Sequence, residues 1–328
     1  MRALRHTPPL LNIGKKILEV SKPGAPLLQL TNPMNPLCGA LEQLEGLIVY
    51  GICHGVDDTE GIFAKQLGVP KDQVRIRAAG NNHNIFCTEI EVGDETYTQE
   101  RFSELGTEIF DTPFREEVYK RYQGLVANYS RHPIEFLPDF LNPESEYGKK
   151  WGVSPIAAEI DPRLGERQDR ARKLLELALA QREPIGWRSE RQGYGLELDA
   201  DGRAEIGHSR EVIDDFIVAL ENRSDFSIHL NVANRRSIEG VGDEYSVEIP
   251  VMFHKGVMSR KPVRFQNDAI TQEIDRVGKE QYLLSQACLN RDEELLVESL
   301  SMDVLVPNRE IATRLVREMI RFEEEYIT

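Results

Sequence analysis

Two side chains in this 328-residue chain have the chemistry to bind a transition metal together, the thiol of Cys53 and the imidazole of His83. Thiolates and imidazoles are ligands of divalent transition metals, and a pair of them leaves the other coordination positions open to substrate oxygens and water. The two residues lie 83 − 53 = 30 positions apart, which matches no local metal motif. The spacing alone therefore favours a buried cysteine and a hydrogen-bonded structural histidine.

Two short apolar runs, Leu27–Leu30 and Leu47–Ile52, precede the first reactive residues. Apolar runs of this length are typical of buried strands in a parallel sheet. Open α/β sheets bind their ligands beyond the carboxyl ends of the strands. We therefore expect the polar residues that follow the strands to gather on one rim of a sheet. These residues are Asn32, Cys53, His54 and His83.

Three segments carry a family resemblance: TNPMNPL (31–37), YGICHG (50–55) and AGNNHN (79–84). In this order they resemble the family 4 glycoside hydrolases, and most closely the α-galactosidase and α-galacturonidase branch, in which a Cys-His pair follows the second strand. The likeness extends to the opening MRALRHTPPLL and, more thinly, to the C-terminal half. This NAD-dependent family departs from the two-carboxylate scheme of most glycosidases. The resemblance implies that NAD is the cofactor and that Cys53 and His83 bind a divalent metal, expected to be Mn²⁺.

The resemblance also implies binding roles for three residues. Asn32 is expected to donate an amide hydrogen bond to a sugar hydroxyl or to the cofactor, although Asn-Pro favours a turn in any protein. Asn82, in the Asn-His pair of the family, is expected to contact the substrate. Arg2, in the RALR segment, is expected to contact the cofactor. Asn84 stands where the family has a bulky apolar residue.

Two side chains are expected to move protons. His54 stands beside the expected metal ligand, where an imidazole donates to the leaving-group oxygen or to a sugar hydroxyl. Some members of the family have an acidic residue there, so the identity of the general acid stays open. The resembled branch also has a Ser-Ser-x-His-x-x-Glu-Tyr segment whose tyrosine removes the C2 proton of the sugar. Tyr147 is the matching position, although Pro143 stands where the histidine of that segment would fall; the alternative is an ordinary surface or interface tyrosine.

The implied reaction is hydrolysis of an α-galacturonide or an α-galactoside. NAD takes a hydride from sugar C3, the metal binds the C2 and C3 oxygens, and Tyr147 removes the C2 proton. The glycosidic oxygen leaves by elimination, water adds, and the hydride returns, so that no net oxidation is seen. Two alternatives stay open. One is an NAD-dependent dehydrogenase of a hydroxy acid, and the other is a catalytically incomplete fragment or subunit of the family.

A glycine-rich turn of the Gly-x-Gly-x-x-Gly type is absent from the sequence. Such a turn normally seats the pyrophosphate of a dinucleotide on a helix N-terminus. In the resembled family the RALR segment lies inside the first domain, just after a Gly-Gly segment. The expected explanations are a truncated N-terminus or a protein without the adenosine half of the cofactor site.

The expected fold is α/β. We expect residues 1–84 to be the remaining half of a dinucleotide-binding domain, the C-terminal part of a Rossmann-like parallel sheet. Residues 85–328 are expected to form a mixed α+β catalytic and dimerisation domain that binds substrate and metal. Helical signals predict five helices, at Met1–Val20, Thr59–Leu67, Ser209–Asn222, Asp268–Asn290 and Asn308–Tyr326, and a charged sixth at Asp161–Arg182. Further strands are predicted at Gln73–Ala78, Ile85–Val92, Phe226–Ala233 and Ser246–Phe253, and residues 131–153 are expected to be irregular.

Composition limits the classes of partner. The chain is 40% hydrophobic and 29% charged, with a net charge of −15 and a pI near 5.1. An acidic protein of this kind is not expected to bind nucleic acid, and no apolar run is long enough for a membrane span. Four cysteines without a close-spaced framework indicate reduced thiols and a cytoplasmic protein. The expected partners are a small-molecule glycoside and further copies of the chain, in a homodimer or a homotetramer.

Overall fold

The computed structural model describes residues 2–137, 139–153, 188–190, 193–195 and 212–322. The chain forms two compact units. One comprises Met1–Ser154 with Phe216–Thr328, and the other comprises Pro155–Asp215. The described part of the second unit contains an antiparallel pair of strands, β6 (Arg188–Glu190) and β7 (Gly193–Gly195). The helix expected at Asp161–Arg182 lies outside the described residues.

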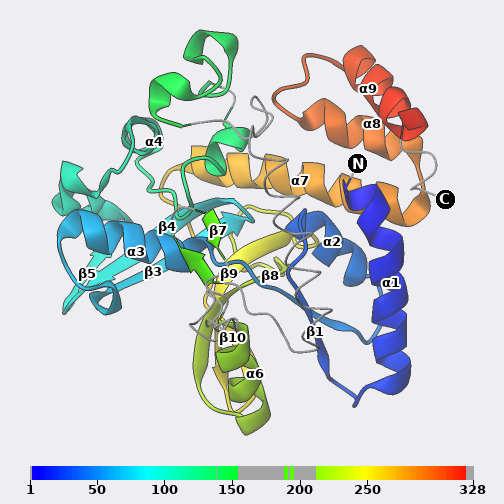
Figure 1. Ribbon diagram of the computed structural model, residues 1–328, viewed down its shortest axis with the longest axis horizontal. Coiled ribbons are helices and arrows are strands. Elements are labelled where there is room, and N and C mark those ends of the chain that lie inside the picture. The colour runs from blue at the N-terminus through cyan, green and yellow to red at the C-terminus, as the bar shows by residue number, and fades with distance from the viewer. Residues whose placement is uncertain (1, 138, 154–187, 191–192, 196–211, 323–328) are drawn as a thin grey trace. The chain divides into compact units, whose positions relative to one another are not determined.

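A mixed sheet forms the centre of the first unit (Figure 1). Its strands follow the order β1-β2-β8-β9-β3-β4-β5, and β10 pairs with β9. The strands are β1 (Pro26–Gln29), β2 (Ile48–Gly51), β3 (Val74–Asn81), β4 (Asn84–Val92), β5 (Glu95–Thr98), β8 (Phe226–Ala233), β9 (Ser246–His254) and β10 (Val257–Arg260). Every strand predicted from the sequence is present within a few residues of its expected bounds, and a turn at Gly93-Asp94 joins β4 to β5.

Eight helices lie wholly or partly within the described residues. They are α1 (Arg2–Val20), α2 (Met34–Leu41), α3 (Gly55–Leu67), α4 (Pro113–Tyr122), α6 (Ile213–Asn222), α7 (Asp268–Asn290), α8 (Glu293–Met302) and α9 (Arg309–Phe322). The bounds of α7 are those predicted, and α7 packs against α2, α8 and the strands β3 and β9. Residues 131–153 contain short 3₁₀ turns instead of a long helix, as expected. Within the described ranges, none of the helices combines the length and apolar character that a membrane crossing requires.

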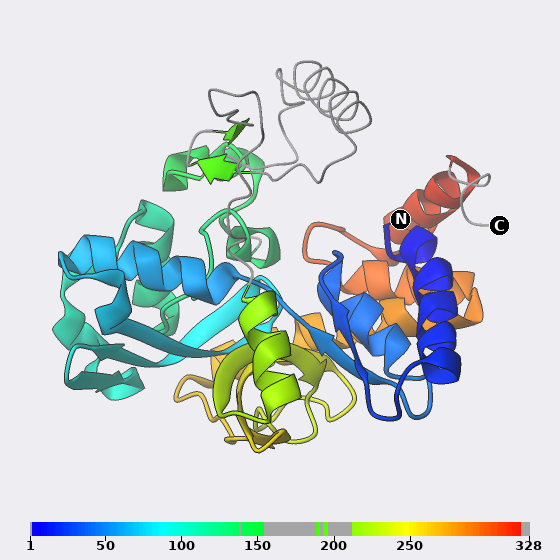
Figure 2. The same ribbon diagram turned by 60° about the horizontal axis from the view of Figure 1, so that its bottom comes forward.

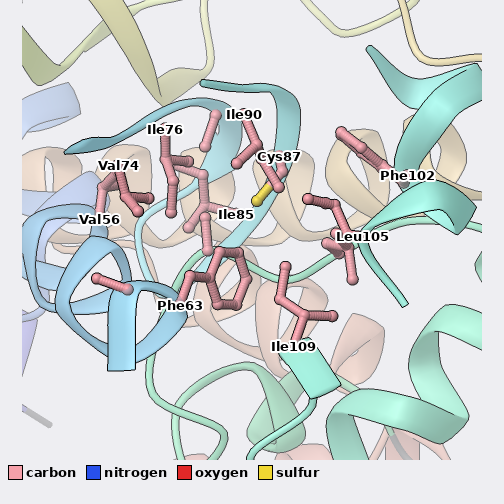
Figure 3. Close-up of a cluster of buried hydrophobic side chains, with 14 residues drawn as sticks. Val56, Phe63, Val74, Ile76, Ile85, Cys87, Ile90, Phe102, Leu105 and Ile109 are labelled. Atoms are coloured by element: carbon pink, nitrogen blue, oxygen red, sulfur yellow. The ribbon is translucent and has the colours of Figure 1, made fainter. Parts of the chain in front are cut away.

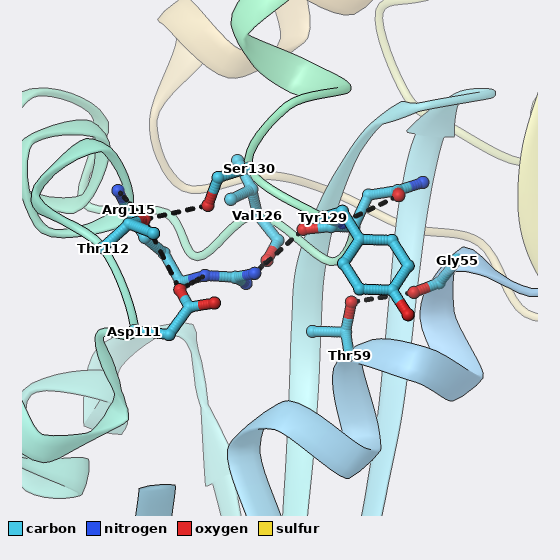
Figure 4. Close-up of polar contacts among 9 residues, drawn as sticks. Gly55, Thr59, Asp111, Thr112, Arg115, Val126, Tyr129 and Ser130 are labelled. Carbon is cyan, nitrogen blue, oxygen red and sulfur yellow. Dashed lines mark hydrogen bonds and ion pairs between the residues drawn. The ribbon is translucent and has the colours of Figure 1, made fainter. Parts of the chain in front are cut away.

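One helix start differs from the prediction. The helix predicted at Met1–Val20 is confirmed by α1, which contains both Pro8 and Pro9. The helix predicted at Thr59–Leu67 starts earlier, because α3 begins at Gly55, and the residue before it, His54, makes no side-chain capping bond. Thr59 lies within the helix, where its Oγ1 donates to the Gly55 carbonyl at 2.8 Å (Figure 4).

The strand directions also differ from the expected parallel sheet. β1 and β2 are parallel, as predicted, but β2 pairs with β8 in the antiparallel sense. The pairs β8–β9 and β9–β3 are antiparallel as well, so β3 runs opposite to β2. The α/β class is therefore confirmed, with a mixed sheet in place of a parallel one. The boundary expected after residue 84 stays a prediction.

An apolar cluster lies between α3 and the hairpin of β3 and β4 (Figures 2 and 3). Phe63 of α3 and Ile85 and Ile90 of β4 are fully buried in it. Cys87 also packs there as a small buried hydrophobic residue, as the apolar strand around it leads one to expect. The cluster fixes α3, and so the loop that precedes α3, against the hairpin.

Candidate functional site

One row of paired residues across the sheet links the carboxyl ends of β2 and β3. Gly51, the last residue of β2, is the Cα partner of Asn231. Asn231 is in turn the partner of Glu248, and Glu248 is the partner of Gly80 near the end of β3. We call these four residues the strand-end row. The strands β8 and β9 lie between the two ends, and the expected gathering of Asn32, Cys53, His54 and His83 on one rim stays a prediction.

Close packing holds the β2 end of this row. A Cβ atom on Gly51 would lie 2.7 Å from the Cβ of Asn231 and 2.7 Å from the Sγ of Cys38, so no larger residue fits. A Cβ on Gly55 would lie 2.3 Å from the Nδ2 of Asn128. The two glycines therefore fix the path of the intervening residues, which carry the candidate chemistry.

Cys53 and His54 occupy that short loop. Cys53 is half-buried and His54 is exposed. The Nε2 of His54 lies 3.5 Å from the carboxylate of Asp58, one turn into α3. An imidazole that is exposed and has a carboxylate partner is suited to exchanging protons with a bound ligand.

His83 lies at the tip of the hairpin between β3 and β4. Asn82 and His83 are its two connecting residues, since Asn81 pairs with Asn84. The backbone of His83 is left-handed, with φ of +73°, which is uncommon for a residue other than glycine and here forms part of the tight turn. Asn82 is buried, and its Nδ2 donates to the Oε2 of Glu248 at 2.9 Å.

A second histidine, His132, stacks on His83 with a ring-centroid distance of 4.0 Å. Burial lowers the pKa of His83 to about 4, and the positive charges of His54 and Arg131 lower it further. Burial and the charge of His83 lower the pKa of His132 to about 3. His83 is therefore neutral near pH 7 and has a nitrogen lone pair to offer a metal ion.

Arg115 fixes the segment that carries His132 (Figure 4). Its side chain is fully buried in α4, and its guanidinium donates to the carbonyl of Val126 and, at 2.9 Å, to that of Asn128. A third donor, Nε, bonds the carboxylate of Asp111 at 2.9 Å. One cation thus holds the chain just before Tyr129, whose ring centroid lies 6.3 Å from that of His132.

Several buried polar atoms near the row have no hydrogen-bond partner. They include Oε1 of Glu248, Oδ1 of Asn231, and both side-chain polar atoms of Asn81 and Asn84. Burial raises the pKa of Glu248 to about 7, while the bond from Asn82 and the charge of His54 lower it. Buried groups of this kind are usually paired, so a cluster of exceptions is typical of a site that takes up polar ligands or water.

Three of the predicted site residues are not among these buried polar residues. Arg2 is the first residue of α1, and Asn32 follows β1; both are exposed. The buried amide near Asn32 is that of Asn35, whose Nδ2 donates to the Ser246 carbonyl at 2.7 Å. Tyr147 is 51% exposed in a left-handed turn with φ of +52°.

Sequence reasoning missed His132, Glu248 and Arg115. A signal for His132 was present, because Ser130, His132 and Glu135 reproduce the Ser-x-His-x-x-Glu spacing of the family segment, with Phe136 at the tyrosine position. The sequence showed Glu248 only as one residue of the strand predicted at Ser246–Phe253. Arg115 gave no signal, since its partners are 11 and 13 residues away along the chain.

Cys53 and His83 suit a metal that completes its coordination with other oxygens. In the part of the chain that the structure describes, no group of three or more His, Cys, Asp and Glu side chains is arranged to hold a metal ion. A half-buried thiol and a neutral imidazole are nevertheless a fitting donor pair, and substrate and water can supply the rest.

The fold and site together define an α/β protein with a cysteine–histidine pair at the ends of its strands. Residues 78–306 match the model of the family 4 glycosyl hydrolase C-terminal domain. This match covers more than half of the chain, and the chain belongs to that family.

Similar proteins agree with this assignment. An α-galactosidase of Bacillus subtilis (strain 168) is 26% identical over 253 residues, which are 76% of this chain and 53% of that protein. The chain therefore spans about half the length of this relative. Among solved structures, a putative glucosidase, lplD, from Bacillus subtilis has a TM-score of 0.76 at 20% identity, over 97% of this chain and 73% of its own. The 6-phospho-β-glucosidase of Thermotoga maritima, solved with manganese, NAD⁺ and glucose-6-phosphate, has a TM-score of 0.67 at 20% identity, over 99% and 71% of the two chains.

Proposed function

We propose that this protein is an NAD- and Mn²⁺-dependent glycosidase that cleaves α-galactosides or α-galacturonides. Family membership supports the glycosidase class, and the α-galactosidase relative supports the sugar. The observation that supports the proposed site is that the Cys53–His54 loop and the Asn82–His83 turn follow the two ends of the strand-end row, with burial lowering the pKa of His83 to about 4.

Two bound groups complete the proposed site. Cys53 and His83 would hold Mn²⁺, and Arg2 and Asn32 would contact NAD. When bound, they supply Lewis acidity at the sugar oxygens and hydride exchange at sugar C3. The proposal for the metal rests on the donor pair described above. The proposal for NAD rests on the resemblance and on a relative solved with NAD⁺, because the sequence contains no glycine-rich phosphate turn.

His54 is the proposed proton donor to the leaving group. Its exposure gives access to a ligand, and the nearby carboxylate of Asp58 orients the ring. Asn82 is the proposed contact to a sugar hydroxyl. Its Nδ2 is used by Glu248, so its carbonyl oxygen is the atom left to accept from the substrate.

A tyrosine is the proposed base that removes the C2 proton. Tyr147 is the residue that the sequence favours. Tyr129 is the tyrosine whose ring lies near the stacked histidines. The variants Tyr147→Phe and Tyr129→Phe separate the two, because loss of the base abolishes exchange of the sugar C2 proton with deuterium, and loss of a packing contact does not.

An activity assay with two readouts tests the proposal. The chain would be incubated with NAD⁺, Mn²⁺ and a reducing agent, and with nitrophenyl α-galactoside, α-galacturonide or 6-phosphoglucosides. We expect release of nitrophenol from an α-galactoside or α-galacturonide that requires both NAD⁺ and Mn²⁺, without accumulation of NADH. Steady NADH formation from a hydroxy acid would identify a dehydrogenase instead. No release with both groups bound would contradict the proposal.

We also propose a homodimer or homotetramer with a small-molecule glycoside as substrate. Light scattering on the purified chain gives the oligomeric mass directly. A monomer at micromolar concentration would contradict this part of the proposal.

A further inference from the structure

A buried carboxyl group contacts the turn that carries His83. Glu248, in β9, is fully buried, and its Oε2 accepts the hydrogen bond from Asn82 Nδ2. The two residues are 166 positions apart in the sequence. The bond therefore ties the turn to a different part of the sheet, and it is not a local feature of the hairpin.

The turn has a conformation that such a contact can help to hold. His83 has a left-handed backbone, which is uncommon for a residue with a Cβ, although histidine adopts it more often than most. Asn82 is the residue directly before it, so an anchor on Asn82 limits the torsions available to His83. Neighbouring contacts on the β3 side are equally tight, since a Cβ on Gly80 would lie 2.3 Å from the carbonyl oxygen of Asn84.

The sheet register places Glu248 for this task. Its Cα partner is Gly80, two residues before Asn82. In an antiparallel pair, residues two apart on one strand share a face, so a side chain at position 248 reaches the residue at 82 diagonally. The hydrogen bond thus follows from the pairing of β9 with β3, which places the acceptor directly under the turn.

We propose that Glu248 is a positioning residue, which anchors Asn82 and thereby holds the His83 imidazole in its metal-binding orientation. The metal part rests on the proposed function, in which His83 is a ligand. The anchoring part concerns the metal-free protein and stands by itself. Groups that orient a metal ligand typically affect affinity by about 10-fold to 100-fold when they are removed.

Three variants test the proposal. Glu248→Leu removes the acceptor, Glu248→Gln keeps an amide oxygen that can accept the same bond, and Ser246→Ala is the matched control. Ser246 is buried in the same strand, and its Oγ has no hydrogen-bond partner. Mn²⁺ binding is measured by calorimetry, and amide hydrogen exchange of residues 81–84 is measured by mass spectrometry without metal.

In Glu248→Leu we expect about 10-fold weaker Mn²⁺ binding and about 10-fold faster exchange at the turn. Glu248→Gln is expected to stay within about threefold of the parent for both, because the same bond can form. Ser246→Ala is expected to change neither quantity. Unchanged exchange and unchanged affinity in Glu248→Leu would overturn the proposal.

Two complications have separate answers. If Glu248→Leu does not fold, Asn82→Ala removes the same hydrogen bond from the other partner, and its exchange at residues 83–84 must rise about 10-fold for the proposal to stand. If the parent chain does not bind Mn²⁺, the proposed function fails at its metal. The exchange measurement then still decides whether Glu248 anchors the turn.

Discussion

The apolar cluster around Phe63 and the strand-end row differ sharply, although both include residues of β3. In the cluster, close-packed side chains such as Phe63 and Ile85 are fully buried among other apolar groups. In the row, Asn231 and Glu248 are buried just as completely and keep polar atoms without partners. Gly80 of the row is the Cα partner of Ile85 of the cluster, so the two regions meet at one residue pair of the β3–β4 hairpin. We infer that the first region supplies stability and the second retains unsatisfied groups for function.

The largest effect is expected in the apolar cluster. Phe63→Ala removes a fully buried ring from a packed site, so it should lower the free energy of unfolding by about 3–5 kcal/mol. Urea unfolding followed by circular dichroism measures this change. Phe322→Ala, at a ring that is 87% exposed, is the control and should change stability by less than about 0.5 kcal/mol. An equal loss of unfolding free energy in Phe63→Ala and Phe322→Ala would contradict the role of the apolar cluster in stability.

The next effect concerns Arg115, a fully buried cation whose guanidinium lies over the ring of Phe63, 5.2 Å from its centroid. Arg115→Met leaves the carbonyls of Val126 and Asn128 without their donors and should cost about 3 kcal/mol. Arg121→Met is the control on the same helix, where the surface ion pairs with Glu117 and Asp139 contribute less than about 1 kcal/mol. Thermal unfolding compares the two. A loss at Arg121 as large as that at Arg115 would show that burial does not set the size of the effect.

The pH dependence of stability tests the row itself. The pKa of Glu248 rises from its ordinary value of 4.5 to about 7 in the folded state, chiefly through burial. Between these pH values the native state holds a proton that the unfolded state has lost. The stabilising contribution of protonated Glu248 is therefore fully present below about pH 4.5 and is lost as the pH rises through 7.

Glu248→Gln removes this titration. From pH 5 to pH 8, the free energy of unfolding of the variant should rise relative to that of the parent by on the order of 1–3 kcal/mol. Denaturant unfolding at the two pH values measures the difference. The raised pKa values of Glu42 and Glu280 act equally in both proteins and cancel. If the free energies of unfolding of the two proteins changed equally with pH, the pKa of Glu248 would not be raised in the folded state.

The smallest effect has the opposite sign. Asn84 is fully buried, and neither of its side-chain polar atoms has a partner, so Asn84→Val should raise stability by about 1 kcal/mol. Differential scanning calorimetry detects a shift of this size. Ile85→Val, at the next position in the apolar cluster, is the matched comparison and should lower stability by about 1 kcal/mol. A loss of stability in Asn84→Val would mean that its polar atoms are satisfied.

The sequence predicted local elements well and their pairing poorly. The bounds of β8 and α7 follow from residue patterns within each segment. The antiparallel direction of β3 depends on β9, which lies far along the chain, and no local pattern encodes it. The expectation that Cys53 lies near His83 came from the rule for parallel sheets; the sheet is mixed, and this expectation stays a prediction.

The site residues show the same limit. His54 and His83 stood out because they follow apolar strands. Glu248 reads as an ordinary strand residue until its strand is paired, and Arg115 reads as a surface cation until the chain folds around it. Tyr147 and Arg2 depended on the resemblance alone, and their roles stay predictions.

The metal-binding pair is tested most directly by Mn²⁺ calorimetry on the reduced chain and three variants. We expect one bound Mn²⁺ per chain, with binding at least about 100-fold weaker in Cys53→Ser and in His83→Gln. His254→Gln, at an exposed histidine paired with Asp225, should bind like the parent. Unchanged Mn²⁺ affinity in both Cys53→Ser and His83→Gln would contradict the assignment of the metal site to the ends of β2 and β3.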